Sequence, residues 1–454
     1  MSTLTIAIVI VFIIGYAGIA LESVTKVNKA AVALLMFVAC WTLYMVSPES
    51  YVPGAGGMDA SSLLSKVNSI IEEHLGSTAP TLFFLMGAMT IVEIVDQNGG
   101  FNFVRNALRT KSKRKLMWRI VLLTFFLSAI LDNMTTSIVM VMVLNKLVAN
   151  RHDRMTFASL VIIAANSGGA FSPIGDVTTI MLWNKSLITS AGVIKEIFIP
   201  SVIAIVVPAI ILQFSLHGKL AAAGGPAVNS ESNAFTDRER KVIFFLGVGG
   251  LIFVPIFRYL TNLPPFVGIL LVLALLWVTT ELFYRHLRGK EEKGSMNKRV
   301  SNVLSKIDMS TILFFLGILM AVSCLEEVGV LGAVGKWLNQ VSGGNHYIVT
   351  GTIGVISSIV DNVPLVAGCM GMYPLAATGD FAVDGIFWQL LAYCAGVGGS
   401  ILIIGSAAGV VVMGLEKISF GWYMKHVSWL ALAGYFAGML CYFAINTLLR
   451  GYQL

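Results

Sequence analysis

The sequence predicts an all-α polytopic membrane protein built from two inverted-topology repeats, each with a re-entrant helical hairpin and a broken transmembrane helix. Three observations predict this fold class: the composition, the recurrence of apolar segments, and a match between the two halves of the chain. Of the 454 residues, 56% are hydrophobic and 12% are charged. Soluble domains carry about a quarter charged residues, so this chain has too few to cover a water-facing surface.

Apolar segments long enough to cross a bilayer recur along the whole chain. The first of them lacks a preceding basic residue, and the first cation is Lys26, so we expect an uncleaved first helix with its N-terminus outside. The predicted spans lie near residues 4–20, 30–47, 79–95, 157–183, 193–216, 241–259, 264–284, 307–328, 386–413 and 422–449.

The net charge of +7 is concentrated in short loops such as KSKRK at 111–115 and the basic stretch at 285–299. This distribution is typical of cytoplasmic loops and does not form the basic stripe that binds nucleic acid. We therefore expect a lipid bilayer as the surroundings and no nucleic-acid partner. A polar, small-residue-rich linker, 217–240, is expected in the cytoplasm and separates a first repeat at 1–216 from a second at 241–454.

The two halves resemble each other at three places. TLFFLMGAMTIVEIVDQNG at 81–99 matches TILFFLGILMAVSCLEEVG at 311–329, and NSGGAFSPIGDVTTI at 166–180 matches GVGGSILIIGSAAGV at 396–410. Asp132-Asn133 matches Asp361-Asn362, and all three matches have nearly the same separation along the chain. With five full spans per half, the second repeat must cross the membrane upside down, an arrangement typical of secondary transporters.

The segment around Asp132 predicts a hairpin near 116–145. Thirty residues separate Lys115 from Lys146, with Asp132 close to their middle. Two full spans would need roughly 40 residues and a turn, so the chain enters the membrane and returns without crossing it. Because both ends are basic, this re-entrant hairpin should enter from the cytoplasm.

The segment around Asp361 predicts the matching hairpin near 346–379. No lysine or arginine lies between Trp337 and Glu416, so this hairpin should enter from outside. The two tips would then meet near the middle of the membrane. Two ordinary short helices with a polar kink remain the alternative.

A second irregularity interrupts the predicted spans 157–183 and 386–413. Glycines and Pro173 break the first, and Gly405-Ser406 stands in the second where Gly175-Asp176 stands in the first. Irregular backbone at membrane depth is tolerated where it is buried in protein or lines a cavity. We therefore expect a broken helix in each repeat, with the acidic group only in the first.

Three carboxylates, Asp132, Asp176 and Asp361, are predicted to lie in the membrane core. Ionisable residues placed there usually face a cavity or an ion path. The segments around them, 120–145, 157–184 and 346–413, contain no lysine or arginine, which favours a bound cation over an anion. Neighbouring carboxylates in a low dielectric can hold either protons or a metal cation. The alternative for Asp132 is a purely structural helix cap.

Enzyme classes find no support in the sequence. It has no GxSxG, HExxH, GxxxxGK[ST] or CxxC motif, and no segment long enough for a soluble nucleotide domain. The five cysteines lie within apolar segments at unrelated spacings, as expected of packing residues. We expect neither a cofactor nor catalytic activity.

Four motifs resemble those of the NhaD-type Na⁺/H⁺ antiporters of the ion transporter superfamily: LFFLMGAMTIVEIVDQNGGF (82–101), SAILDNMTTSIVM (128–140), NSGGAFSPIGDVTTIMLW (166–183) and SSIVDNVPLVA (357–367). The resemblance spans both halves. It implies exchange of Na⁺, and also Li⁺, for H⁺ by alternating access across a bacterial cytoplasmic membrane, in sodium and pH homeostasis. It also implies a homodimer, each protomer having a scaffold and an elevator-like transport part.

The resemblance assigns cation- and proton-binding roles to eleven positions, and the match between the halves adds Ser400 and Ser406. Na⁺ itself is expected at Asp132, Asn133 and Asp176. The eleven positions are Ser128, Asp132, Asn133, Thr135, Asn166, Asp176, Thr178, Thr179, Ser357, Asp361 and Asn362.

Two alternatives remain open, and a third, a dicarboxylate carrier, is disfavoured by the residues at the tips. An arsenite/antimonite or other anion permease of the same superfamily shares the architecture and the acidic-amide tips. Dicarboxylate carriers typically bear Ser-Asn-Thr at both tips, whereas these tips read Asp-Asn-Met-Thr and Asp-Asn-Val-Pro. An ion channel is the alternative from another class, but it would leave the paired broken helices without a purpose.

Overall fold

The structure is a computed structural model that describes residues 2–449 apart from 21, 53, 101–106, 109, 219, 221–235, 287–302, 306 and 360. The elements in these ranges are helices. Seven of the described helices are long and apolar enough to cross a membrane, which confirms an all-helical polytopic membrane protein. Most of the predicted linker 217–240 lies outside the described residues.

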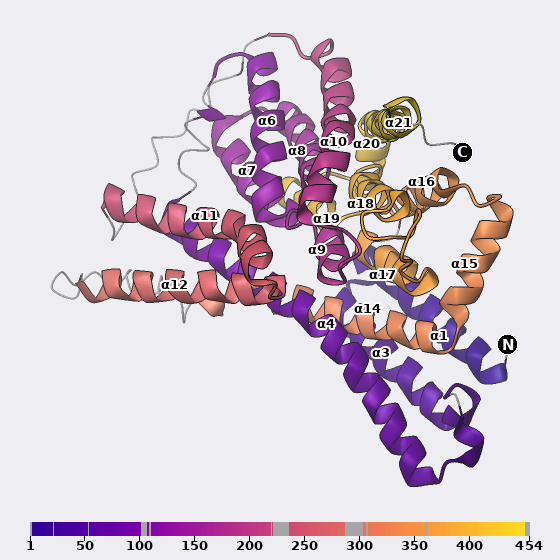
Figure 1. Cartoon of the computed structure of the whole chain (residues 1–454). Helices are drawn as coiled ribbons and strands as arrows, with labels where there is room; N and C mark the ends of the chain where they lie inside the picture. The colour runs from indigo at the N-terminus through magenta and orange to yellow at the C-terminus, as the bar shows by residue number, and fades with distance from the viewer. Residues whose placement is uncertain are drawn as a thin grey trace.

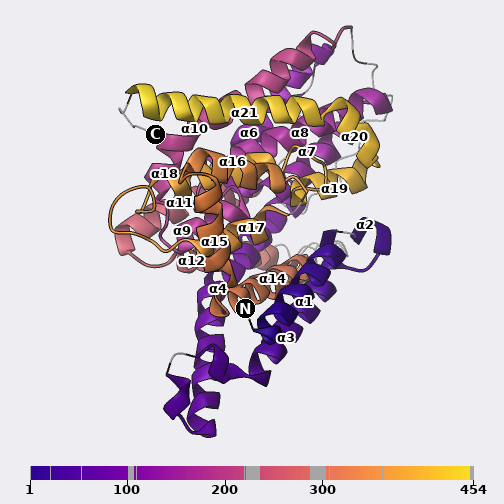
Figure 2. The same cartoon turned by 90° about the vertical axis from the view of Figure 1, so that its right-hand side faces the viewer.

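The helices form two groups that pack against each other (Figures 1 and 2). In the first, which we call the α4–α14 group, α3 packs along α1 and α14, and α4 contacts α11, α12 and α14. Helices α1, α3, α4 and α14 make up the lower part of both views. The group comprises α1 (Thr3–Ala20), α2 (Glu22–Thr25), α3 (Lys29–Val46), α4 (Ala60–Gln97), α11 (Asp237–Thr261), α12 (Pro265–His286) and α14 (Met309–Glu327), with two 3₁₀ turns, η1 (Pro48–Ser50) and η2 (Ala55–Gly57).

The second group, which we call the broken-helix group, draws on both halves of the chain. It comprises α6 (Lys113–Leu131), α7 (Asn133–Leu147), α8 (Arg151–Ala170), α9 (Val177–Asn184), α10 (Ser190–Gln213), α16 (His346–Ile356), α17 (Asn362–Met372), α18 (Ile386–Gly398), α19 (Ala407–Glu416), α20 (Phe420–His426), α21 (Ser428–Ala444) and the π-helical turn η5 (Ile445–Leu449). Helix α15 (Val330–Val341) joins α14 to this group. The two groups meet where α17 contacts α14 and α9 contacts α4.

Two pairs of short helices occupy the places of the predicted hairpins. Helices α6 and α7 pack against each other and are joined at Asp132, whose φ of 77° reverses the chain. Its carboxylate accepts from the N–H of Thr135 and so caps α7. In the other pair, α16 ends at Ile356 and α17 begins after Asp361, which caps α17 through the N–H of Val363.

Both predicted helix breaks are present. Helix α8 ends at Ala170 and α9 begins at Val177, while α18 ends at Gly398 and α19 begins at Ala407. In each case a polar residue restarts the helix by accepting a backbone N–H group: Asp176 before α9 and Ser406 before α19. Each break therefore places a capping side chain beside irregular backbone inside the protein.

Two predicted spans differ from the observed helices. The span predicted at 79–95 is the C-terminal half of α4, which has 38 residues and starts after Asp59, because residues 60–78 are helical but too polar for a hydropathy criterion. The span predicted at 422–449 is divided into α20 and α21 at Val427, where φ is −121°. No Pro or Gly announces that division in the sequence.

Glycines let the short helix pairs lie directly on the broken helices. A Cβ on Gly168 of α8 would collide with the Phe125 carbonyl of α6, and a Cβ on Gly398 of α18 would collide with the Gly354 carbonyl of α16. The separation of the two glycines along the chain is close to that of the three sequence matches, and so is the separation of the two carbonyls. The same backbone contact is thus made once in each half of the chain.

We expect Gly398→Ala to destabilise the protein by roughly 1–3 kcal/mol, because the added methyl meets backbone atoms that cannot move aside. Thermal unfolding of the detergent-solubilised protein measures this effect. Gly414→Ala in α19 is the matched control, because nothing lies within 4 Å of its added Cβ. Equal melting temperatures for the two variants would contradict the close approach.

Candidate cation-binding site

The polar centre of the broken-helix group is the carboxylate of Asp176, which is 1% exposed. Its Oδ1 accepts the backbone N–H of Thr178 at 3.0 Å. Its Oδ2 accepts the Asn133 amide at 2.8 Å, and the Asn362 amide donates to both oxygens at 3.4 and 3.3 Å. Amides that follow Asp132 and Asp361, from the two short-helix pairs, therefore converge on one buried carboxylate.

Asn166 extends this network to the second helix break. Its side chain is fully buried, and its Oδ1 accepts the Asn133 amide at 3.0 Å. Its own amide donates to Ser400 Oγ at 3.0 Å and to Ser406 Oγ at 2.9 Å. Six of the predicted site residues thus share one hydrogen-bonded network: Asn133, Asn166, Asp176, Asn362, Ser400 and Ser406.

Four further predicted residues lie around this network and support it. The hydroxyl of Ser128 donates to the Ala165 carbonyl at 2.6 Å, and that of Ser357 donates to the Ala395 carbonyl at 3.0 Å. These bonds hold each short-helix pair on its broken helix. Thr178 and Thr179 are fully buried in the first turn of α9, where the Thr179 hydroxyl donates to the Asp176 carbonyl.

Asp132 lies beside this network. Its two carboxylate oxygens accept the N–H and the hydroxyl of Thr135, each at 2.8 Å. Thr135 in turn lines a cavity of about 380 Å³ together with Glu93, Asp96 and Asp308. The structure therefore brings the predicted pair Asp132 and Thr135 together, next to an acidic cavity.

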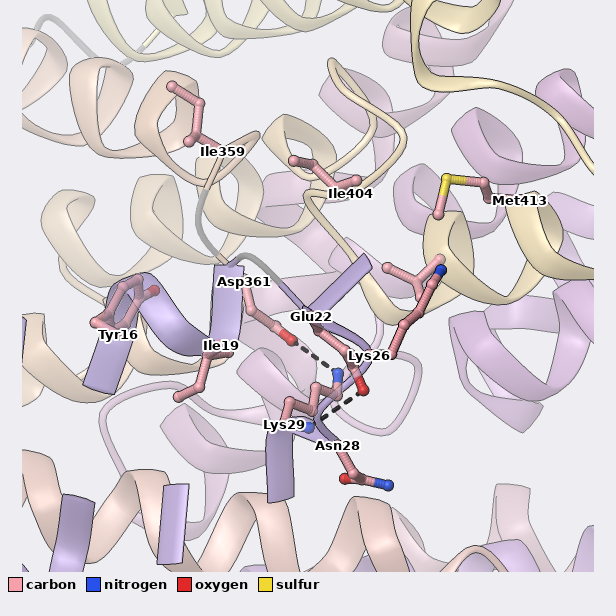
Figure 3. Close-up of a pocket in the computed structure, with 11 residues that line it drawn as sticks. Tyr16, Ile19, Glu22, Lys26, Asn28, Lys29, Ile359, Asp361, Ile404 and Met413 are labelled. Atoms are coloured by element: carbon pink, nitrogen blue, oxygen red, sulfur yellow. Dashed lines mark hydrogen bonds and ion pairs between the residues drawn. The ribbon is translucent and has the colours of Figure 1, made fainter. Parts of the chain in front are cut away.

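Asp361 has a partner that the sequence did not suggest. The ammonium of Lys29, the first residue of α3, lies 3.6 Å from Asp361 Oδ2 (Figure 3). The three segments expected around the site contain no lysine or arginine, and Lys29 comes from none of them. In the sequence Lys29 stands at the start of an apolar span. A lysine there is ordinarily explained as part of the flanking loop, so its position did not indicate a contact with Asp361.

The arrangement defines a class of protein. Two helix breaks with convergent polar side chains are typical of secondary transporters among multi-helix membrane proteins, because the breaks expose the groups that bind small ions or solutes. The ligands available here are carboxylate, amide and hydroxyl oxygens, the set that a hard cation prefers.

Comparison with known proteins is in accord with this class. The family model described as "Citrate transporter" matches residues 8–390, and the chain belongs to this family of membrane transporters. It is 42% identical to sodium/proton antiporter 1 of Arabidopsis thaliana, over 98% of this chain and 73% of the relative. The Na⁺/H⁺ antiporter NhaD of Vibrio cholerae is 28% identical over 98% of this chain and 92% of the relative. The Na⁺/H⁺ antiporter NhaD of Alkalimonas amylolytica is 30% identical over 81% of this chain and 77% of the relative. The resemblance to NhaD-type antiporters is thereby confirmed.

We expect Asn166→Ala to lower stability by about 1–3 kcal/mol, because Asn133 and two serine hydroxyls lose a buried partner. A double-mutant cycle with Ser406→Ala in thermal unfolding checks the assignment, since removal of both partners should cost less than the sum. Strict additivity would show that the 2.9 Å bond contributes nothing to folding.

Proposed function

We propose that the protein exchanges Na⁺ for H⁺ across a membrane and that Asp176 is the group for which the two ions compete. The convergence of the Asn133 and Asn362 amides on one buried carboxylate carries this proposal. The names of the relatives, which are sodium/proton antiporters in both plants and bacteria, support it. Asp132 and Asn133 are the other Na⁺ ligands in this proposal, and Asp361 is a further cation- and proton-binding group beside them.

The chemistry follows from the cost of leaving a carboxylate bare in the protein interior. A buried carboxylate without a counter-charge is strongly disfavoured, so Asp176 holds either a proton or a metal cation. Na⁺ takes oxygen ligands, and the side chains of Asn133, Asn166 and Thr179, which lie in or beside the Asp176 network, carry such atoms. Thr178, whose backbone N–H donates to Asp176, carries a further buried hydroxyl. Exclusion of one ion by the other at a single site gives obligatory exchange when the site faces the two sides in turn.

The repeated contacts support an inverted repeat as the frame for alternating access. Ser128 and Ser357 make equivalent bonds, one in each half of the chain, and Gly168 and Gly398 make equivalent backbone contacts in the same way. In this proposal residues 1–216 and 241–454 are the two repeats, joined by a cytoplasmic linker at 217–240. The hairpin near 116–145 enters from the cytoplasm and the one near 346–379 from outside.

Further parts of the proposal rest on the resemblance to the antiporter family. The protein would also carry Li⁺, act as a homodimer in a bacterial cytoplasmic membrane and serve sodium and pH homeostasis. The division into an α4–α14 group and a broken-helix group (Figure 1) supports an elevator-like motion of the second group against the first.

An anion permease is the less favoured candidate. Citrate or another carboxylate would meet the negative charge of Asp176, to which no lysine or arginine side chain is hydrogen-bonded in the described part of the chain. A channel conducts ions without requiring a site at which one ion excludes another. The liposome experiment below distinguishes both the anion permease and the channel from Na⁺/H⁺ exchange.

We expect purified protein in liposomes to dissipate an imposed pH gradient when Na⁺ or Li⁺ is added, and not when citrate or arsenite is added. Asp176→Asn and Asp132→Asn should each abolish this exchange. An amide lacks the negative charge with which a carboxylate binds a cation, and it has no proton to release. Asp59→Asn, at an exposed residue, is the matched control. Wild-type exchange in Asp176→Asn, with folding verified by gel filtration, would remove Asp176 from the mechanism.

We expect single cysteines at the bases of the two hairpins to be labelled from opposite sides of the membrane. Lys115 and Ala377 are both exposed, and a membrane-impermeant maleimide reports on each. Lys115→Cys should react only from the cytoplasm and Ala377→Cys only from outside, with the parent protein as the background. Labelling of both from one side would contradict the inverted repeat.

A further inference from the structure

Lys29 links the two helix groups at the edge of the proposed cation site. Its ammonium lies 3.6 Å from the Asp361 carboxylate and 4.4 Å from the centroid of the Phe314 ring of α14. Its backbone N–H donates to Glu22 at 3.2 Å. Because α3 packs along α14, the position of Lys29 is set by the α4–α14 group, whereas Asp361 belongs to the broken-helix group.

The pair is one residue away from the network around Asp176. Asp361 caps α17, and the next residue, Asn362, donates its amide to Asp176. The side-chain exposures of Lys29 and Asp361 are 21% and 15%, so the pair is partly withdrawn from water. A change in the partner of Asp361 therefore acts directly on the chain segment that presents Asn362.

The pair also lines an open cavity of about 460 Å³ (Figure 3). The titratable groups that face it there are Tyr16, Glu22 and Lys26, and Asp176 lies behind it through Asn362. The Lys26 side chain extends away from Asp361 (Figure 3). An ion that reaches this cavity thus meets a carboxylate that a tethered ammonium already occupies.

We propose, on the basis of the proposed Na⁺/H⁺ exchange, that the Lys29 ammonium is the resident counter-cation of Asp361 and that Na⁺ must displace it, so that Lys29 sets the apparent affinity for Na⁺. The lysine stem is flexible and its charge is compact, which suits a group that leaves and returns. Glu22, in the same cavity and already bonded to the Lys29 backbone, offers the displaced ammonium a second carboxylate.

Competition between Lys29 and Na⁺ for Asp361 predicts the direction in which each substitution of Lys29 changes the Na⁺ affinity. When the ammonium is absent, Na⁺ meets Asp361 without a competitor and binds more tightly. When the ammonium is replaced by a guanidinium, two parallel hydrogen bonds to the carboxylate make displacement harder. Neutral and cationic substitutions at this one position are therefore expected to shift the Na⁺ affinity in opposite directions.

The test is the KM for Na⁺ of reconstituted variants at fixed pH. Lys29→Gln should lower KM about tenfold, a typical size for coupling between two sites, and Lys29→Arg should raise it about threefold. Lys26→Gln, at an exposed lysine of the same cavity, should leave KM unchanged. A merely structural ion pair would lower the amount of folded protein in Lys29→Gln without these opposite shifts.

Each outcome decides the inference. An active Lys29→Gln protein with wild-type KM overturns it, and so does an unchanged KM in Lys29→Arg, which preserves the charge and carries the test if the neutral variant does not fold. Absence of Na⁺-driven exchange in the wild-type protein would instead overturn the proposed function. The two failures are therefore distinguishable.

Discussion

The arrangement of the broken-helix group depends on one constraint, a carboxylate at Asp176 that is almost completely shielded from solvent. Such a group needs hydrogen-bond donors and a compensating proton or cation. The donors come from α9 itself and from the amides of Asn133 and Asn362, which belong to helix pairs far apart in the chain. A single side chain thereby links the first helix break to both short-helix pairs.

The two halves share a frame but differ in charge. Ser406 stands where the first half has Asp176, and both restart a helix by accepting a backbone N–H group. Ser406 is reached by Asn166 rather than by a hairpin amide, so the second break completes the hydrogen bonding of the first. A symmetric pair of aspartates would double the negative charge at the centre. The serine keeps the geometry of the cap without adding a second carboxylate.

Much of the broken-helix group could be predicted because short sequence patterns determine where its helices end and restart. The Asp-Asn tips, the Gly and Pro breaks and the spacing of the halves predicted the places of α6 to α9. The family resemblance and the match between the halves predicted the six members of the network. Lys29 was missed because its partner, Asp361, lies in the other half of the chain and no local pattern joins them. The start of α4 was missed because its first residues are polar, and hydropathy reports the membrane-embedded part of a helix only. Pairing across the fold is decided by packing, which periodicity does not encode.

The most direct test of the central claim, that Na⁺ and H⁺ compete for Asp176, is the number of protons released when Na⁺ binds to the detergent-solubilised protein in weakly buffered, mildly acidic solution. We expect proton release that saturates with Na⁺ in the wild-type protein and disappears in Asp176→Asn. Na⁺ binding without proton release, or the same release in Asp176→Asn, would contradict the account.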